Sequence, residues 1–297
     1  MCAAAGALAL FTTAACGGTG TAETAGGKPD MVAAFYPLQW LTEQVGGADV
    51  KVTVLTAPGV EPHDLELGAQ QMAGLEDATL TVYIKGVQPA LDDAVAERDN
   101  AFDAATAVKT LPVGEHAGEE AGHEHEVAYD PHLWLDPSRL ATVATELGER
   151  LAVADPAHAQ AYQDRAATAA ASLTSLDQEL AKGLTSCSSK TMVTSHEAFG
   201  YLADRYHLKQ IGITLDPESE PSPARIAEVA KLANTEKVTT IFTESLVSPK
   251  VAEVLAQEVH AKTAVLDPLE SKPAGQDYLS AMRQNLRTLQ TALGCSS

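Results

Sequence analysis

Residues 155–183, DPAHAQAYQDRAATAAASLTSLDQELAKG, separate two stretches of chain that share one pattern, and they decide how the fold is organised. Asp155 and Pro156 are typical of a helix start, and Gly183 is typical of a helix end. Apolar side chains recur at steps of four and three residues, at Tyr162, Ala166, Ala169, Leu173, Leu176 and Leu180. The spacing predicts one amphipathic helix of about 40 Å, at a rise of 1.5 Å per residue. Such a helix can brace two lobes; a helix inside one large domain is the alternative.

Strand-like runs alternate with helical patterns on both sides of this helix. Residues 30–154 contain MVAAFY, KVTVLT and TLTVYI, and residues 184–297 contain KTMVTS, KQIGIT, TTIFTE and KTAVLD. Strands separated by helices of about ten residues predict parallel βαβ units. We therefore expect an α/β protein with two Rossmann-like lobes, each a parallel sheet with flanking helices, joined by one long rigid helix.

The N-terminus has the pattern of a leader and a tether. Residues 1–15 contain an apolar run that is too short to span a bilayer as a helix, and small residues stand before Cys16. The run resembles a bacterial lipoprotein signal peptide, cleaved before Cys16 and acylated there, although no basic residue precedes it and the true start is expected upstream. An ordinary secretory signal and an Ala-rich start without a targeting role are the alternatives. Residues 16–29, rich in Gly, Thr and Ala, predict a flexible tether.

Charge and cysteine content restrict the partners and the compartment. The net charge of −20 argues against a nucleic-acid partner, because phosphates would be repelled. Apart from Cys2 and Cys16 near the start, only Cys187 and Cys295 remain. In a protein outside the cytoplasm these two are expected to form a disulfide, with two free thiols as the alternative.

One acidic segment fits no regular element. Residues 115–126, EHAGEEAGHEHE, contain His116, His123 and His125 among five glutamates and carry no large apolar side chain. A segment of this composition cannot bury enough surface to fold alone. We expect a loop that binds metal weakly, with a solvated acidic insertion as the alternative.

Three histidines and one aspartate lie in loops and at strand ends where a ligand-binding site is expected. His63 (PGVEPHDLE) follows a predicted strand, His132 lies in YDPHLWLDP, His196 (TSHEAFG) ends a strand, and Asp267 (LDPLE) follows the last strand. Ligands of open α/β sheets gather beyond the carboxyl ends of the strands, so these side chains are expected to converge. Three imidazoles and a carboxylate suit four-coordinate Zn²⁺.

Each of these histidines taken alone is more often a capping or core residue. The fourth ligand is also open. Asp267 is the first choice, while Glu61, two residues from His63, or a water molecule can complete a tetrahedron. Glu244 ends another predicted strand but is more readily explained as a capping carboxylate.

The motifs GVEPHDLE, DPHLWLDP, TSHEAFGYL and LDPLE occur in this order within residues 30–295 and together resemble the zinc-type solute-binding proteins of bacterial ABC importers. The resemblance implies that His63, His132 and His196 are the imidazole ligands and that Asp267 is the carboxylate ligand. Manganese-type relatives have a carboxylate in place of His196, so this position favours zinc. The His- and acid-rich loop before the second ligand also matches.

The resemblance implies a monomeric zinc-binding lipoprotein, not an enzyme, that delivers Zn²⁺ to a membrane permease. It would lie at the outer face of the cytoplasmic membrane, held by its lipid anchor, or in the periplasm. A manganese or iron carrier of the same fold is one alternative; a zinc hydrolase is another, although no H-E-x-x-H motif occurs. An adhesin or an envelope zinc buffer is a further alternative.

Overall fold

A computed structural model describes residues 1, 27–113 and 129–296. Cys16 lies outside the described residues. The same holds for the loop 115–126 with His116, His123 and His125.

The first half of the chain forms a four-stranded parallel sheet in the order β2-β1-β3-β4. Its strands are β1 (Asp30–Ala33), β2 (Lys51–Val54), β3 (Leu80–Tyr83) and β4 (Ala101–Asp103). The helices of this half are α1 (Tyr36–Gly46), α2 (Ala69–Asp77), α3 (Pro89–Val95) and α4 (Pro137–Ala154), with short 3₁₀ turns η1 (Gly47–Asp49), η2 (Ala104–Ala107) and η4 (Leu133–Leu135).

The second half repeats this topology in a sheet of order β6-β5-β7-β8, again parallel throughout. Its strands are β5 (Thr191–His196), β6 (Lys209–Thr214), β7 (Thr240–Thr243) and β8 (Lys262–Val265). Its helices are α6 (Gly200–Tyr206), α7 (Pro223–Thr235), α8 (Lys250–Glu258) and α9 (Tyr278–Leu293). The predicted α/β architecture with two parallel sheets is confirmed.

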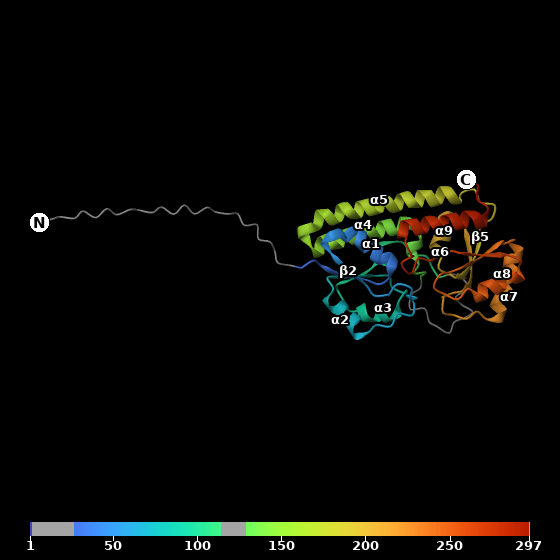
Figure 1. Cartoon of the computed structure of the whole chain (residues 1–297), viewed down its shortest axis with the longest axis horizontal. Helices are drawn as coiled ribbons and strands as arrows, with labels where there is room; N and C mark the ends of the chain where they lie inside the picture. The colour runs from blue at the N-terminus through green and yellow to red at the C-terminus, as the bar shows by residue number, and fades with distance from the viewer. Residues whose placement is uncertain (2–26, 114–128, 297) are drawn as a thin grey trace.

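The connecting helix α5 (Ala159–Leu184) runs along one side of both halves (Figure 1). It follows the 3₁₀ turn η5 (Pro156–His158), so its regular part begins a few residues after the predicted start. The helix contacts α1 and α4 of the first half and α6 and α9 of the second. All six residues of the predicted apolar stripe are buried.

Apolar burial stabilises this attachment more than charge does. Leu173, Leu176 and Leu180 are fully buried, and each contributes about 1.5–3 kcal/mol. Arg283 also pairs with Glu179 of α5 at 2.7 Å, but an exposed pair contributes only about 0–1 kcal/mol. The apolar stripe is therefore the main link between α5 and the two halves.

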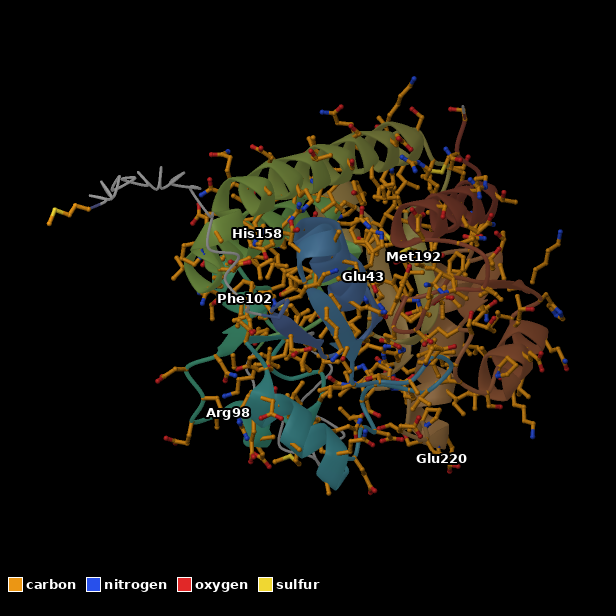
Figure 2. All side chains as sticks on the ribbon, turned by 60° about the vertical axis from the view of Figure 1, so that its left-hand side comes forward. Glu43, Arg98, Phe102, His158, Met192 and Glu220 are labelled. Atoms are coloured by element: carbon orange, nitrogen blue, oxygen red, sulfur yellow. A yellow bond between two sulfur atoms is a disulfide. The ribbon has the colours of Figure 1, made fainter. Side chains whose placement is uncertain are left out.

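The junction between the halves is packed. One core cluster contains residues of the first sheet, such as Met31, together with Met192 and Phe199 of the second half. Figure 2 shows side chains filling the region between the two halves, with Met192 among them. Cys187, shortly after α5, and Cys295 form a disulfide that ties the end of α5 to the C-terminal residues. None of the helices in residues 27–113 and 129–296 is long and apolar enough to cross a membrane.

Two elements of the structure are not predicted from the sequence pattern. Helix α2 buries only Leu75 completely, so it lacks a clear apolar stripe. Strand β4 is three residues long and buries only Phe102.

Candidate metal centre

Four side chains that are far apart in the sequence meet between the two sheets. His63, His132, His196 and Glu270 each offer one ligand atom, and these atoms all lie within 4.8 Å of one another. His63 lies in the loop after β2, His132 directly precedes η4, His196 is the last residue of β5, and Glu270 follows β8. The structure thus brings together the three predicted histidines.

The carboxylate in this cluster is that of Glu270, not the predicted Asp267. One carboxylate oxygen of Asp267 accepts the backbone N–H of Leu269 at 2.8 Å, and the other accepts the hydroxyl of Ser245 at 2.9 Å. Asp267 therefore shapes the turn after β8. That turn directs the side chain three residues later toward the histidines.

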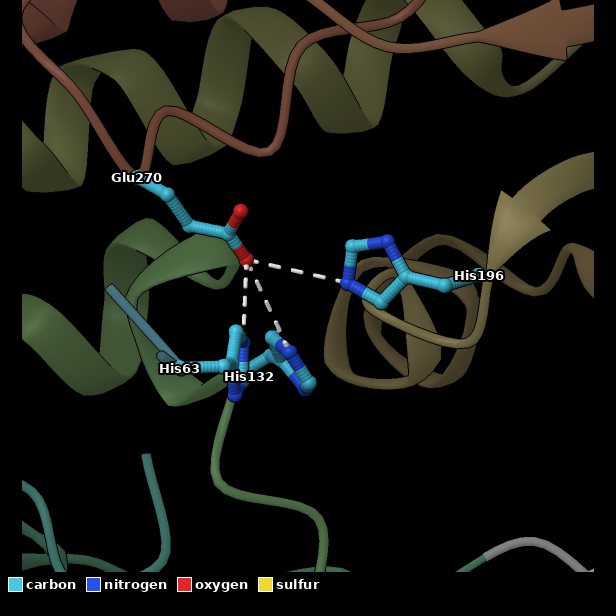
Figure 3. Close-up of side chains that lie close together, drawn as sticks. All are labelled: His63, His132, His196 and Glu270. Atoms are coloured by element: carbon cyan, nitrogen blue, oxygen red, sulfur yellow. Dashed lines mark ion pairs between the residues drawn. The ribbon is translucent and has the colours of Figure 1, made fainter. Parts of the chain in front are cut away.

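The geometry of the cluster matches a small divalent cation. Glu270 Oε1 lies 3.5 Å from His63 Nε2, 3.8 Å from His132 Nε2 and 3.6 Å from His196 Nε2. Dashed lines in Figure 3 mark these three contacts. A tetrahedral zinc ion with bonds of about 2.0–2.1 Å places its ligand atoms about 3.3 Å apart. A contraction of a few tenths of an ångström would bring the carboxylate and each ring to that separation.

The ligand atoms are buried and lack hydrogen bonds. In the part of the chain that the structure describes, the Nε2 atoms of all three histidines and both carboxylate oxygens of Glu270 are shielded from solvent without a hydrogen-bond partner. Buried polar atoms are normally satisfied, because leaving one unpaired costs about 1–3 kcal/mol. Several such atoms facing one point are typical of a cation site.

His132 is held by a carboxylate behind it. Asp130 Oδ1 lies 2.7 Å from His132 Nδ1 and accepts the backbone N–H of His132 at 2.9 Å. Since a carboxylate can only accept, the neutral ring carries its proton on Nδ1. The lone pair of Nε2 then faces Glu270. Asp130 was quoted in the sequence motif but was not singled out as a site residue.

His196 is held in the same way by Glu244. Glu244 Oε2 lies 2.7 Å from His196 Nδ1, and both side chains are almost completely buried. Strands β5 and β7, which lead to these residues, are neighbours at the point where the strand order of the sheet reverses. Ligands of doubly wound sheets bind at this point. From the sequence, Glu244 is predicted to be a capping carboxylate at the end of a strand. In the structure it lies behind a histidine of the cluster.

His63 has weaker support. The carboxylate of Glu61 accepts only its backbone N–H, at 3.4 Å. The other oxygen of Glu61 is buried without a hydrogen bond. Burial and the negative charge of Glu270 raise the pKa of Glu61 to about 7. Glu61 therefore borders the site without belonging to the cluster of four.

Burial and neighbouring charges shift the pKa values of the ligands in different directions. Burial lowers the pKa of His132, despite the opposing effect of Asp130. Burial also disfavours charge on His196, but the carboxylates of Glu244 and Glu270 outweigh it and raise its pKa well above the usual value. The pKa of His63 is raised in the same manner, with Glu270 outweighing burial. In Glu270 the two histidines His196 and His63 outweigh burial and lower the pKa.

A cavity of about 410 Å³ adjoins the cluster, and both His63 and His132 belong to its wall. Its lining is partly apolar, with Leu111 and Leu215, and partly acidic, with Asp216. An acidic wall attracts cations toward the ligand atoms. The cavity thus places open space and negative charge next to the cluster, while the ligand atoms themselves are buried.

Comparison with known proteins finds zinc-binding relatives. Residues 31–292 match the family model described as "ZnuA: Zinc-uptake complex component A periplasmic". The zinc-binding lipoprotein AdcA of Streptococcus pneumoniae (strain ATCC BAA-255 / R6) is 36% identical over 282 residues, which are 90% of this chain and 56% of AdcA. The chain thus spans about half the length of the AdcA relatives. The high-affinity zinc uptake system protein ZnuA of Bacillus subtilis (strain 168) is 33% identical over 96% of this chain and 94% of its own length.

Solved structures of metal-binding proteins also match the chain. The laminin-binding protein Lmb of Streptococcus agalactiae, described as bifunctional with adhesin and metal transporting activity, matches with a TM-score of 0.80 at 32% identity, covering 89% of this chain and 99% of Lmb. The Zn(II)-bound ZnuA-like domain of Streptococcus pneumoniae AdcA matches with a TM-score of 0.76 at 33% identity, covering 90% and 99%. With these matches and the family model over residues 31–292, the chain belongs to the ZnuA family of zinc-uptake components.

Proposed function

We propose that the protein captures Zn²⁺ outside the cytoplasm and delivers it to the membrane permease of an ABC importer. The observation that carries this proposal is the convergence of three Nε2 atoms, none with a hydrogen bond, on the carboxylate of Glu270 in a buried site. His63, His132, His196 and Glu270 would be the ligands. In this role zinc is cargo, so the site must both hold the ion and release it.

The ligand set favours zinc over manganese and iron. Three imidazole nitrogens and one carboxylate form a shell suited to a four-coordinate ion of intermediate softness. Manganese prefers more oxygen ligands and six-fold coordination. His196, in particular, presents nitrogen where an oxygen ligand would favour manganese.

The number of protein ligands argues against a zinc hydrolase. A catalytic zinc site has three protein ligands and keeps one position for water or substrate. Here Glu270 supplies a fourth protein ligand, and its side chain is 1% exposed. A complete protein shell is suited to carriage of the ion.

The finer features of the proposal rest on family membership and on the sequence. The protein would act as a monomer, anchored to the membrane through an acylated Cys16. The segment 115–126 would supply a second, weaker zinc site through His116, His123 and His125. These residues lie outside those that the structure describes.

Zinc titration of purified metal-free protein, in competition with a chelator, tests the proposal. The wild type should bind one Zn²⁺ tightly, and replacement of His63, His132 or His196 by Ala should weaken binding by orders of magnitude. His158→Ala is the matched control, because His158 is an exposed histidine outside the cluster that contacts Asp155 and Tyr162 at the start of α5. If Mn²⁺ displaces Zn²⁺ from the wild type at equal concentration, the zinc assignment is wrong.

Adhesion is a second candidate function, favoured by the likeness to Lmb, which is described as having adhesin activity. A solid-phase assay with immobilised laminin would test it. Binding that survives in the three histidine variants would separate adhesion from metal capture. An absence of saturable binding by the wild type would exclude it.

A further inference from the structure

Trp134 connects the two parts of the chain that supply His132 and Glu270. It lies in η4, two residues after His132, and its ring centroid is 5.1 Å from that of His132. Its indole N–H donates to the carbonyl oxygen of Pro268 at 2.7 Å, two residues before Glu270. One side chain of the first half thus holds the turn that carries the carboxylate ligand.

The turn itself has a shape that needs support. Leu269 has a φ of 60°, in the left-handed region that leucine rarely adopts. Asn285 of α9 holds the start of the turn by accepting the N–H of Asp267 at 3.1 Å and donating to its carbonyl at 2.6 Å. These two bonds come from the second half, whereas the bond from Trp134 comes from the first half.

Trp134 is itself fixed in place. Its side chain is completely buried, and the ring of Phe35 packs edge-on against it with centroids 4.7 Å apart. The hydroxyl of Tyr278, on α9, donates to the backbone carbonyl of Trp134. An indole confined in this way can act as a rigid spacer between His132 and the turn after β8.

We propose that Trp134 is a positioning residue for the metal centre: its bond to Pro268 fixes the Glu270 carboxylate against His132 and so slows the release of zinc. This inference rests on the proposed function. If the bond is lost, the carbonyl of Pro268 is left buried without its partner. From the first half, only the hydrogen bond from the N–H of Gly59 to Ser271 Oγ, one residue after Glu270, then still holds this segment. The carboxylate must then be ordered each time an ion binds. The entropy lost in that ordering lowers the affinity for zinc.

The first test replaces Trp134 with Phe, which keeps an aromatic ring and removes the N–H. Loss of an outer partner of a metal ligand lowers affinity about 10–100-fold. We expect the dissociation constant for Zn²⁺ to rise by that factor, through faster dissociation measured by stopped-flow transfer to a chelator. The d–d bands of tetrahedral coordination in the Co²⁺-loaded protein should also weaken, which a change in packing away from the metal centre would not cause.

A matched control separates this effect from a general loss of stability. Phe102 is a buried aromatic residue of β4 that packs against Arg150. Phe102→Leu should lower the melting temperature without changing the zinc dissociation rate. If Trp134→Phe fails to fold, 3-benzothienylalanine at position 134 keeps the bicyclic ring and removes only the N–H donor.

A double-mutant cycle identifies the ligand through which Trp134 acts. In a Glu270→Ala background, Trp134→Phe should change zinc affinity by less than about threefold, because the carboxylate that it positions is gone. An equal loss of affinity in both backgrounds would overturn the inference. So would unchanged zinc dissociation in the single variant while the wild type binds tightly. A wild type that binds no zinc would instead contradict the proposed function.

Discussion

Glu244 holds His196 at two points: one carboxylate oxygen lies 2.7 Å from Nδ1 of the ring, and the other accepts the backbone N–H of His196 at 3.0 Å. The ring can then neither rotate nor change its tautomer without losing a charge-assisted hydrogen bond. Its Nε2 lone pair is directed toward Glu270. Asp130 holds the ring and the backbone N–H of His132 in a similar way, but with one oxygen, Oδ1, for both contacts.

Glu244→Gln tests this arrangement. The amide can still occupy the space, but it loses the negative charge that raises the basicity of the ring. We expect zinc affinity to fall about 10–100-fold, as for other outer partners of metal-bound histidines. Chelator competition at neutral pH measures the change. Glu253→Gln on α8 is the control, and equal affinities of the two variants would remove Glu244 from the site.

Variants at Glu270 and at Asp267 should affect metal binding in opposite ways. Glu270→Gln should weaken zinc binding by several orders of magnitude, since it removes the carboxylate ligand and its charge. Asp267→Asn should retain the tetrahedral Co²⁺ spectrum, because Asp267 bonds to Leu269 and Ser245 and stands outside the cluster. If Asp267→Asn loses the spectrum while Glu270→Gln keeps it, the assignment of the fourth ligand is reversed.

The pH dependence of stability should differ between the metal-free and the zinc-bound protein. A histidine whose pKa is raised on folding stabilises the fold fully below its unfolded pKa of about 6.5, and this contribution is lost as pH rises through the folded pKa. His196 and His63 have raised pKa values. The metal-free protein should therefore lose stability as pH rises above about 6.5.

Zinc reverses this trend, because it binds neutral imidazoles and its affinity rises as their protons leave. Over the same pH range the increase in melting temperature caused by saturating Zn²⁺ should grow. Calorimetric melting with and without Zn²⁺ at a series of pH values measures both. A zinc-induced shift that shrinks between pH 6 and 8 would contradict the pKa directions assigned to His196 and His63.

Removal of the disulfide should cost stability but leave the metal centre intact. Cys187 and Cys295 are separated by 108 residues, and closing a loop of that size stabilises a fold by about 4–5 kcal/mol in the chain-entropy model. The double variant Cys187→Ser, Cys295→Ser should unfold at a lower denaturant concentration. Its zinc affinity should stay within about threefold of the wild type. A large loss of affinity would mean that the bond also fixes the two halves at the metal centre.

Much of the fold could be predicted because local pattern and tertiary burial agree. The run KQIGIT coincides with β6, and the closing helical pattern coincides with α9. The stripe on α5 is buried as its spacing indicates. Helix α2 and strand β4 were missed because each buries a single residue completely, which leaves no period to detect.

The site was predicted less completely, for a conformational reason. The sequence favours Asp267 because it ends the strand-like run KTAVLD. In the structure β8 ends at Val265, and the turn after it bends so that Glu270 faces the histidines. The turn depends on a positive φ at Leu269, and a leucine gives no signal of that conformation. The supporting roles of Asp130 and Glu244 depend on distances that only the folded chain shows.

Crystals of the zinc-loaded protein, with anomalous diffraction measured on both sides of the zinc edge, test the central claim most directly. We expect one strong anomalous peak within about 2.0–2.2 Å of the Nε2 atoms of His63, His132 and His196 and of a carboxylate oxygen of Glu270. A peak that lies elsewhere, or one that contacts the histidines of only one half of the chain, would contradict it.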